Sequence, residues 1–259
     1  MTIADVAALP ECVYADDSVV LLQGRWEGFT WALQRARESA DARGTLVHCL
    51  VDPPYSELTH RGSDAAVERS CDGANRAELG YEFWTPEDVH LFVASLNPLV
   101  TGWFCAMTDD VLAPSWRAAY QEAGRYDFAP VSIIIHKPRL VGDGPGSCTI
   151  RMPVCRPREK RFIGWGSLPG WYRANPAHSF VQGAKSLDLM RALVRDYSRP
   201  GDLILDPCAG GATTLLAARL EGRRAIGIEM DPETAQKAAT LLKHGRVALR
   251  NPDNLCLDL

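Results

Sequence analysis

Residues 203–211 have the sequence Leu-Ile-Leu-Asp-Pro-Cys-Ala-Gly-Gly, an apolar run that ends in a turn with two adjacent glycines. The run predicts a strand, and a helix from about Ala212 to Glu221 follows before Gly222 ends it. A second strand over 225–228 then leads to Glu229. This succession is typical of α/β proteins that hold a nucleoside by its ribose hydroxyls.

The glycine turn differs from the two common nucleotide fingerprints. It lacks the Gly-x-Gly-x-x-Gly spacing of dinucleotide sites, and the chain has no Gly-Lys-Ser/Thr phosphate loop. Gly210 and Gly211 would let the backbone approach a ligand, and the following helix offers free amide donors. A simple tight turn is the alternative, and Asp231 is better explained as a helix cap than as a ligand.

A second functional stretch lies far upstream. Residues 44–55 have the sequence Gly-Thr-Leu-Val-His-Cys-Leu-Val-Asp-Pro-Pro-Tyr, and the prolines must end the strand because they cannot donate to a ladder. Asp52 to Tyr55 therefore follow the carboxyl end of a strand, where ligands bind in open α/β sheets. The alternative is a rigid turn without chemistry.

The rest of the chain alternates between predicted strands and helices. We expect strands over 102–107 and 131–136, a loop over 56–80, and helices over 85–96, 114–123, 186–197 and 231–243. The alternation predicts an α/β fold in one domain over 1–259, a Rossmann-like, mostly parallel sheet with helices on both faces. Residues 138–179, rich in Pro, Gly, Arg and Trp, are expected to form a short irregular insertion that reads the substrate.

Composition excludes several protein classes. The 259 residues are 46% hydrophobic and 23% charged, which is typical of globular proteins and not of disordered or coiled-coil chains. No apolar run approaches the length of a membrane span and no secretory signal is visible, so we expect a cytoplasmic protein. Eight cysteines without a Cys-x-x-Cys pair and six dispersed histidines predict reduced thiols and no metal site.

Together the two stretches resemble a known enzyme family. Asp52-Pro53-Pro54-Tyr55 resembles the Asp/Asn/Ser-Pro-Pro-Tyr/Phe motif of amino methyltransferases, and 206–211 resembles their cofactor loop. The catalytic motif precedes the cofactor loop, as in the circularly permuted class termed beta DNA methyltransferases. The resemblance covers residues 46–242 and implies methyl transfer from S-adenosyl-L-methionine (SAM) to the N6 amine of adenine in duplex DNA.

The chemistry of that reaction explains the motif. An exocyclic amine is a poor nucleophile because its lone pair is delocalised into the ring. Asp52 and the Pro53 carbonyl can accept its two hydrogens, which frees the lone pair for in-line attack on a sulfonium methyl. Pro54 stiffens the segment. Tyr55 offers a face for an extruded base, and stacking of ~1–3 kcal/mol offsets part of the flipping cost.

The resemblance also implies a set of cofactor contacts. Lys185 stands where the family usually has Lys-Pro, although Ser186 follows here, and Asp17 resembles the acid near the cofactor adenine. The loop has Gly210-Gly211-Ala212 in place of the commoner Gly-Ser-Gly. The expected cofactor-binding residues are Asp17, Asp52, Lys185, Asp206, Pro207, Cys208, Ala209, Gly210, Gly211, Thr213, Thr214, Glu229 and Met230.

If DNA is the substrate, a local basic surface must hold it, because the formal net charge is −4. Basic residues cluster in and beside the insertion, and a solvated loop is the alternative explanation. The expected DNA-binding residues are His60, Arg139, Arg156, Arg158, Lys160, Arg161 and Arg173.

Other functions remain open at this point. A cytosine N4 methyltransferase is the closest rival, although its motif more often begins with Ser. An RNA or protein amine methyltransferase and a noncatalytic nucleic-acid-binding protein are further alternatives. A homodimer and a cognate restriction nuclease, or none, are the partners considered in addition to DNA.

Overall fold

The computed structural model describes residues 3–60, 82–135, 148–159, 165–175 and 185–250. Its largest element is a mixed eight-stranded sheet with the order β1-β2-β11-β10-β3-β4-β8-β5. Its strands are β1 (Cys12–Ala15), β2 (Val19–Gln23), β3 (Val47–Val51), β4 (Phe104–Ala106), β5 (Tyr126–Asp127), β8 (Val154–Arg156), β10 (Leu203–Asp206) and β11 (Arg224–Glu229).

The centre of this sheet is parallel and its edges are antiparallel. The pairs β2–β11, β11–β10, β10–β3 and β3–β4 are parallel, whereas β1–β2, β4–β8 and β8–β5 are antiparallel. Parallel strands need long crossovers, and helices supply them here. The carboxyl ends of β2, β11, β10, β3 and β4 therefore lie along one edge, which we call the carboxyl edge; the other is the amino edge.

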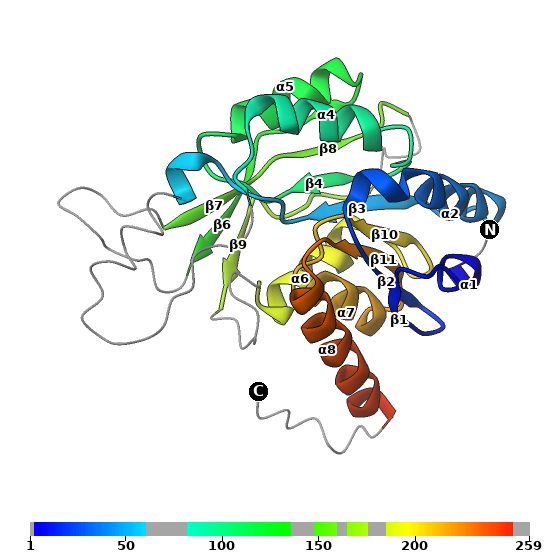
Figure 1. Ribbon diagram of the computed structural model, residues 1–259. Coiled ribbons are helices and arrows are strands. Elements are labelled where there is room, and N and C mark those ends of the chain that lie inside the picture. The colour runs from blue at the N-terminus through cyan, green and yellow to red at the C-terminus, as the bar shows by residue number, and fades with distance from the viewer. Residues whose placement is uncertain (1–2, 61–81, 136–147, 160–164, 176–184, 251–259) are drawn as a thin grey trace, which may run out of the picture.

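Helices cover both faces of the sheet (Figure 1). One core joins Leu33, Phe92 and Trp116 to alternate residues of β3, and the other joins Leu193 and Leu215 to the opposite face. Because buried strands present apolar side chains to both faces, such a sheet must be covered twice. The helices are α1 (Ile3–Val6), α2 (Thr30–Ala42), α4 (Pro86–Leu96), α5 (Ala113–Glu122), α6 (Leu187–Tyr197), α7 (Thr213–Leu220) and α8 (Pro232–Arg250), with a 3-10 helix η1 (Trp26–Phe29).

The predicted irregular insertion is wrong at three segments that form strands, whereas residues 165–170 form neither helix nor strand, as expected. Residues 149–156 and 171–174 form strands: β7 (Thr149–Met152) and β9 (Trp171–Ala174) flank β6 (Val131–Ile135) in a separate three-stranded sheet, and β8 joins the main sheet. Pro153 separates β7 from β8, and its carbonyl accepts a hydrogen bond from Ala106 N at 3.2 Å. The proline marks the passage of the chain between sheets, and the sequence interpretation took it for irregularity.

Other boundaries also differ from expectation. Residues 57–60 are helical where a loop was predicted, and 61–80 lie outside the described residues. No element was predicted before residue 44, yet the hairpin β1–β2 and helix α2 lie there. The last helix continues to Arg250, beyond the expected end at Lys243. Among the described helices, none combines the length and apolar character that crossing a membrane requires.

Candidate active site

The carboxyl edge brings together the two stretches that the sequence analysis singled out. Asp52 follows β3, Asp206 ends β10 and Glu229 ends β11, and these three strands are consecutive neighbours in the sheet. Burial raises the pKa of Asp206, and the charges of Asp52 and Glu229 add to this, as expected for carboxylates at adjacent strand ends. Adjacent parallel strands thus place residues that are far apart in the sequence side by side.

Asp52 has two polar partners in this edge. Its Oδ2 pairs with the Nζ of Lys185, and its Oδ1 accepts a hydrogen bond from the Tyr55 hydroxyl at 3.0 Å. Lys185 also lies over the Tyr55 ring, 5.6 Å from its centroid. Lys185 was expected to contact the cofactor, whereas these contacts join it to the Asp-Pro-Pro-Tyr motif.

The glycine turn and Glu229 form one hydrogen-bonded unit. Gly210 N donates to Glu229 Oε2 at 2.8 Å, and Asp231 N donates to Oε1 at 2.9 Å. Gly210 has a φ of 49°, and a Cβ added there would meet no atom within 4 Å. The turn ends with Ala212, which takes a left-handed conformation at φ 58° before α7 begins. Open space above a glycine beside a carboxylate suits a ligand that approaches the backbone closely.

The buried acids have perturbed protonation. Burial raises the pKa of Asp206 to about 7, and the charges of Asp52 and Glu229 add to this against hydrogen bonds from Thr214 and the Cys208 amide. Burial also raises the pKa of Glu229, against the amides of Asp231 and Gly210. Acids that repel one another in a half-enclosed edge are stabilised by a cation, so this edge favours a positively charged ligand.

Asp109 holds the backbone that follows the Asp-Pro-Pro-Tyr motif, a role that the sequence analysis missed. Asp109 Oδ2 accepts hydrogen bonds from Ser56 N at 2.9 Å and from Thr59 Oγ1 at 2.6 Å. Burial opposes ionisation of Asp109, but the hydrogen bonds from Ser56 and Thr59 outweigh it and lower its pKa. Asp109 follows β4, so its place after an apolar run was the signal that could have identified it.

The prediction that Asp17 contacts the cofactor is wrong, because Asp17 lies at the other edge of the sheet from Glu229. Asp17 precedes β2, and β2 runs parallel to β11 with Val19 beside Ala225 and Gln23 beside Glu229. Asp17 therefore lies at the amino edge, a strand length from Glu229. Its neighbour Asp16 is structural, because it pairs with Arg219 at 2.8 Å and caps the turn into β2.

Residues at the other end of β2 lie where Asp17 was expected. Gly24 N donates to the Glu229 carbonyl at 2.8 Å, which places Gln23 and Gly24 beside Glu229. Burial raises the pKa of Cys208 and the charge of Glu27 adds to this, so Glu27 too lies near the glycine turn. The apolar run Val19–Leu22 followed by Gly24 was the signal that the sequence analysis left unused.

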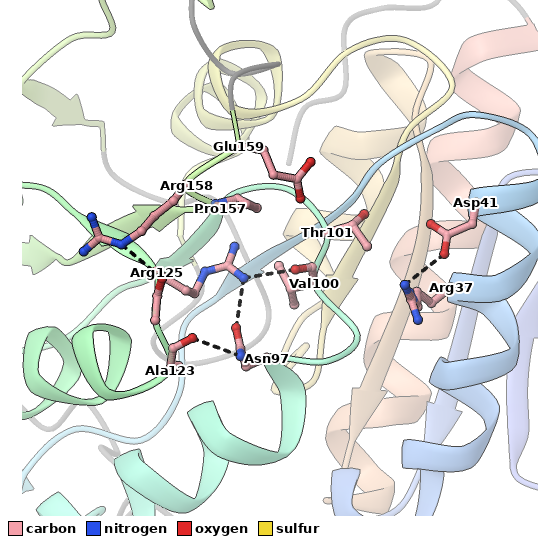
Figure 2. A pocket seen from close by; sticks show the side chains of 11 residues that line it. Arg37, Asp41, Asn97, Val100, Thr101, Ala123, Arg125, Pro157, Arg158 and Glu159 are labelled. Carbon is pink, nitrogen blue, oxygen red and sulfur yellow. Dashed lines mark hydrogen bonds and ion pairs between the residues drawn. The ribbon is translucent and has the colours of Figure 1, made fainter.

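Two of the expected DNA-binding arginines lie at the amino edge. Strand β8 is antiparallel to β4, with Cys155 beside Phe104, so Arg156 and Arg158 lead away from Asp52. Arg156 lies 4.9 Å from the Tyr126 ring centroid. Figure 2 shows Arg158 beside a groove of about 620 Å³ that Arg37, Asn97 and Arg125 also line. This groove contains no residue of the two motifs, so the chemistry locates the site at the carboxyl edge instead.

The remaining expected DNA-binding residues divide into two groups. Arg173 is exposed on β9, and His60 ends the helical turn after the motif, with its ring 6.2 Å from that of Phe83. Arg139, Lys160 and Arg161 lie outside the described residues. Within the described part of the chain, no cluster of three or more His, Cys, Asp or Glu side chains could hold a metal ion.

A sequence-family model matches part of this chain. Residues 148–240 match the family model described as DNA methylase. The YubD protein of Escherichia coli (strain K12) is 39% identical over 62 residues. That alignment covers 24% of this chain and 26% of YubD, so the chain spans about a quarter of the length of this relative.

Solved structures share the fold over most of the chain. The M1.HpyAVI–SAM complex is 17% identical with a TM-score of 0.61, covering 86% of this chain and 98% of that one. The Thermus thermophilus protein TTHA0409 complexed with SAM is 20% identical with a TM-score of 0.57, covering 87% of this chain and 93% of that one.

The cytosine-N4-specific PvuII DNA methyltransferase is 13% identical with a TM-score of 0.58, covering 93% of this chain and 95% of that one. At such identities the likeness shows the fold alone. The chain thus has the mixed α/β fold of solved DNA methyltransferases, and its residues 148–240 match the DNA methylase family model.

Proposed function

We propose that this protein is a SAM-dependent DNA methyltransferase that modifies the exocyclic N6 amine of adenine. The observation that carries the proposal is the shared position of Asp52, Asp206 and Glu229 at the carboxyl ends of three adjacent strands. The DNA methylase match over 148–240 supports the reaction class. The order of the two motifs is the one that the permuted class has.

The residues of the carboxyl edge fit SAM. Glu229 can accept hydrogen bonds from ribose hydroxyls, because each of its oxygens keeps a lone pair beyond those used by Gly210 and Asp231. The space above Gly210 admits a ligand against the backbone. When bound, SAM would supply an electrophilic methyl on a sulfonium, and its positive charge would offset the mutual repulsion of Asp52, Asp206 and Glu229.

The motif then acts on the amine. Asp52 and the Pro53 carbonyl accept its two hydrogens and hold the nitrogen lone pair toward the methyl donor. Tyr55 stacks the extruded base. Asp109 holds Ser56 and Thr59, so the turn that follows the motif is fixed before the substrate arrives. No covalent intermediate with the protein is needed.

The outer face of the three-stranded sheet suits DNA. Trp171 is 56% exposed, and Arg173 lies two residues on along the same face of β9. Arg151 of β7 shares this face through its pairing with Ser132, and it reaches back to Asp110 near the carboxyl edge at 2.6 Å. An exposed indole with flanking guanidinium groups suits nucleic-acid backbone and base contacts. We therefore assign target recognition to the face of β7 and β9 that carries Arg151, Trp171 and Arg173.

Cytosine N4 methylation is the second candidate. The PvuII enzyme, which shares the fold, is described as cytosine-N4-specific, and the amines of the two bases are chemically similar. Asp at position 52 favours adenine, because the cytosine motif more often begins with Ser. The cytoplasmic location, the single catalytic domain, a homodimer and a partner nuclease stay predictions from the sequence.

The experiment is transfer of tritiated methyl from SAM to mixed duplex DNA, RNA and protein, with digestion of the product to nucleosides. We expect label in DNA as N6-methyladenine. Asp52→Ala should reduce transfer at least about 100-fold while SAM binding persists, because it removes an acceptor that acts in the transition state. Glu229→Ala is the matched variant and should lose SAM binding first. Label in RNA or protein alone, or unchanged turnover in Asp52→Ala, would refute the proposal.

A further inference from the structure

The side chain of Lys185 lies where the proposed reaction needs the amine of the substrate. Its ammonium pairs with Asp52 Oδ2, while Tyr55 donates to Asp52 Oδ1 at 3.0 Å. The same ammonium lies 5.6 Å from the centroid of the Tyr55 ring. Both oxygens of the carboxylate and one approach to the aromatic ring are therefore engaged by the protein itself.

The protein places this lysine through a capped helix. Lys185 directly precedes Ser186, the N-cap of α6, whose hydroxyl accepts a hydrogen bond from Leu189 N at 3.4 Å. Leu189 and Leu193 anchor α6 in the core, so the backbone beside Lys185 is fixed. The Lys185 side chain is only 16% exposed and that of Asp52 25%. This ion pair is thus a half-enclosed contact rather than a surface pair.

A substrate amine would compete for the same groups. An ammonium and an exocyclic amine both donate N–H groups, and a cation and a stacked base both use the face of an aromatic ring. We propose that Lys185 occupies the amine position of the free enzyme and that the target base must displace it. This inference rests on the proposed function, and it replaces the expected cofactor contact of Lys185 with a role in substrate selection.

The occupant has a physical reason to be cationic. Without a substrate, the carboxylate of Asp52 lies close to those of Asp206 and Glu229. The ammonium of Lys185 offsets the electrostatic repulsion between Asp52 and these two acids. A ligand displaces Lys185 only if it supplies an N–H donor for Asp52 Oδ2 and a flat face for Tyr55. A base with an exocyclic amine meets both demands, whereas thymine lacks the amine.

The first test follows the accessibility of the Lys185 amine. Wild-type protein is acetylated briefly with an N-hydroxysuccinimide ester. The reaction is run with and without a random-sequence duplex pool and S-adenosylhomocysteine, and the acetylated fraction of Lys185 is measured by peptide mass spectrometry. We expect labelling of Lys185 to rise severalfold with DNA, and also in Asp52→Ala without DNA. Labelling that either change leaves unaltered would overturn the inference.

The second test removes the ammonium. Lys185→Met roughly keeps the length of the side chain but removes its charge. It should raise kcat/KM for DNA severalfold through a lower KM. Lys237→Met is the matched control, because Lys237 pairs with Glu233 on the surface of α8. A fall in kcat/KM, or loss of SAM binding, in Lys185→Met would overturn the inference. Absence of methyl transfer in the wild type would refute the proposed function, whereas DNA-dependent labelling would still support the displacement of Lys185.

Discussion

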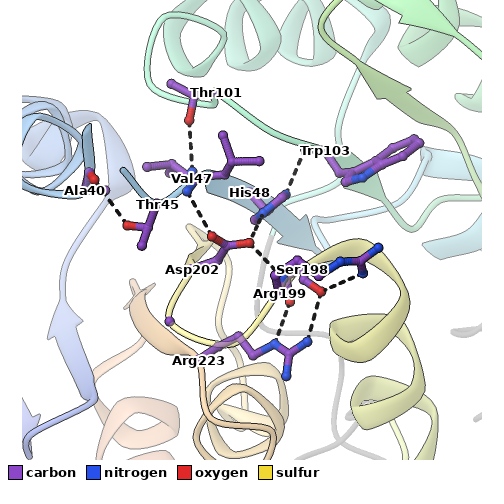
Figure 3. Close-up of polar contacts among 12 residues, drawn as sticks. Ala40, Thr45, Val47, His48, Thr101, Trp103, Ser198, Arg199, Asp202 and Arg223 are labelled. Atoms are coloured by element: carbon purple, nitrogen blue, oxygen red, sulfur yellow. Dashed lines mark hydrogen bonds and ion pairs between the residues drawn. The ribbon is translucent and has the colours of Figure 1, made fainter. Parts of the chain in front are cut away.

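At the scale of single residues, a buried histidine holds together the two strands that carry the site. His48 of β3 is fully buried, its Nε2 lies 2.9 Å from Asp202 Oδ2, and its Nδ1 accepts a hydrogen bond from Trp103 N at 2.9 Å (Figure 3). Because Nδ1 accepts, the proton of the neutral ring is on Nε2, which donates to Asp202. The contact fixes β3 against the start of β10, and thereby Asp52 against Asp206.

This histidine predicts a pH dependence of stability. Burial lowers the pKa of His48, against hydrogen bonding and charge from Asp202, so below about pH 6.5 the unfolded chain binds a proton that the folded chain refuses. The free energy of unfolding should then fall as the pH drops from about 6.5, by at most ~1.4 kcal/mol per pH unit. Above about pH 6.5, the stabilising contribution of His48 to the free energy of unfolding is fully present.

The measurement compares variants because a second group works in the opposite direction. Asp206, with its pKa raised to about 7, keeps a proton that the unfolded chain loses between about pH 4 and 7, so it favours folding at low pH. Urea unfolding of the wild type and His48→Gln between pH 7.5 and 5.5 separates the two. We expect the variant to lose the acid-side decline due to His48, while His90→Asn, a half-buried control outside this network, keeps it. Equal slopes in the wild type and His48→Gln would contradict this.

Single residues also show what the sequence could predict about the site. Asp52 and Glu229 were identifiable because each follows an apolar strand at the edge where α/β sheets bind ligands. The prediction for Asp17 was wrong because the sequence does not show at which edge of the sheet an acid beside a strand lies. Only the pairing of β2 with β11 shows that Asp17 lies at the amino edge. The contact of Lys185 with Asp52 joins residues 133 positions apart, and no local pattern encodes it.

At the scale of elements, helix α4 positions the motif as well as the core. Thr85 is its N-cap in a capping box: Thr85 Oγ1 accepts from Asp88 N at 3.4 Å, and Asp88 Oδ2 accepts from Thr85 N at 2.8 Å. One residue earlier, Trp84 N donates to the Tyr55 carbonyl at 3.0 Å. The start of α4 therefore also holds the backbone of the aromatic residue of the motif.

Removing the Thr85 cap should destabilise helix α4 and the backbone contact that it makes with the Asp-Pro-Pro-Tyr motif. Thr85→Ala should lower the free energy of unfolding by about 1 kcal/mol, because it leaves a helix amide without its acceptor. Urea denaturation provides the measurement, and Thr85→Ser is the matched control because it keeps the hydroxyl. A Ser variant that is as unstable as the Ala variant would show that the methyl group, and not the cap, carries the effect.

The elements that the sequence predicted share a strong local signal. Helices α4, α6 and α7 have a cap, a proline or a terminal glycine beside an apolar period, and strands β3, β10 and β11 are short apolar runs with clear ends. Strands β7, β8 and β9 carry arginines and border prolines or glycines, so their propensity is weak. They exist because tertiary pairing supplies what the local sequence does not.

At the scale of the whole molecule, the sheet divides the arginines into two sets. Arg173 and Arg151 belong to the small sheet, which continues from the carboxyl edge through the pairing of Thr108 with Arg151. Arg156 and Arg158 lie at the amino edge, and Arg158 lines the groove of Figure 2. Both sets fall within the predicted insertion 138–179, so sequence position alone could not separate them.

This division predicts which arginines contact DNA. Neutralising a phosphate contact reduces the slope of log K against log salt by about 0.9. Arg173→Ala should show that reduction in binding to a random-sequence duplex between about 50 and 200 mM salt, a range over which screening is strong. Arg158→Ala is the matched control, because it removes the same charge from the opposite edge and should leave the slope unchanged. If the slope falls in Arg158→Ala and not in Arg173→Ala, the duplex binds across the amino edge, and the base could not reach Asp52 from there.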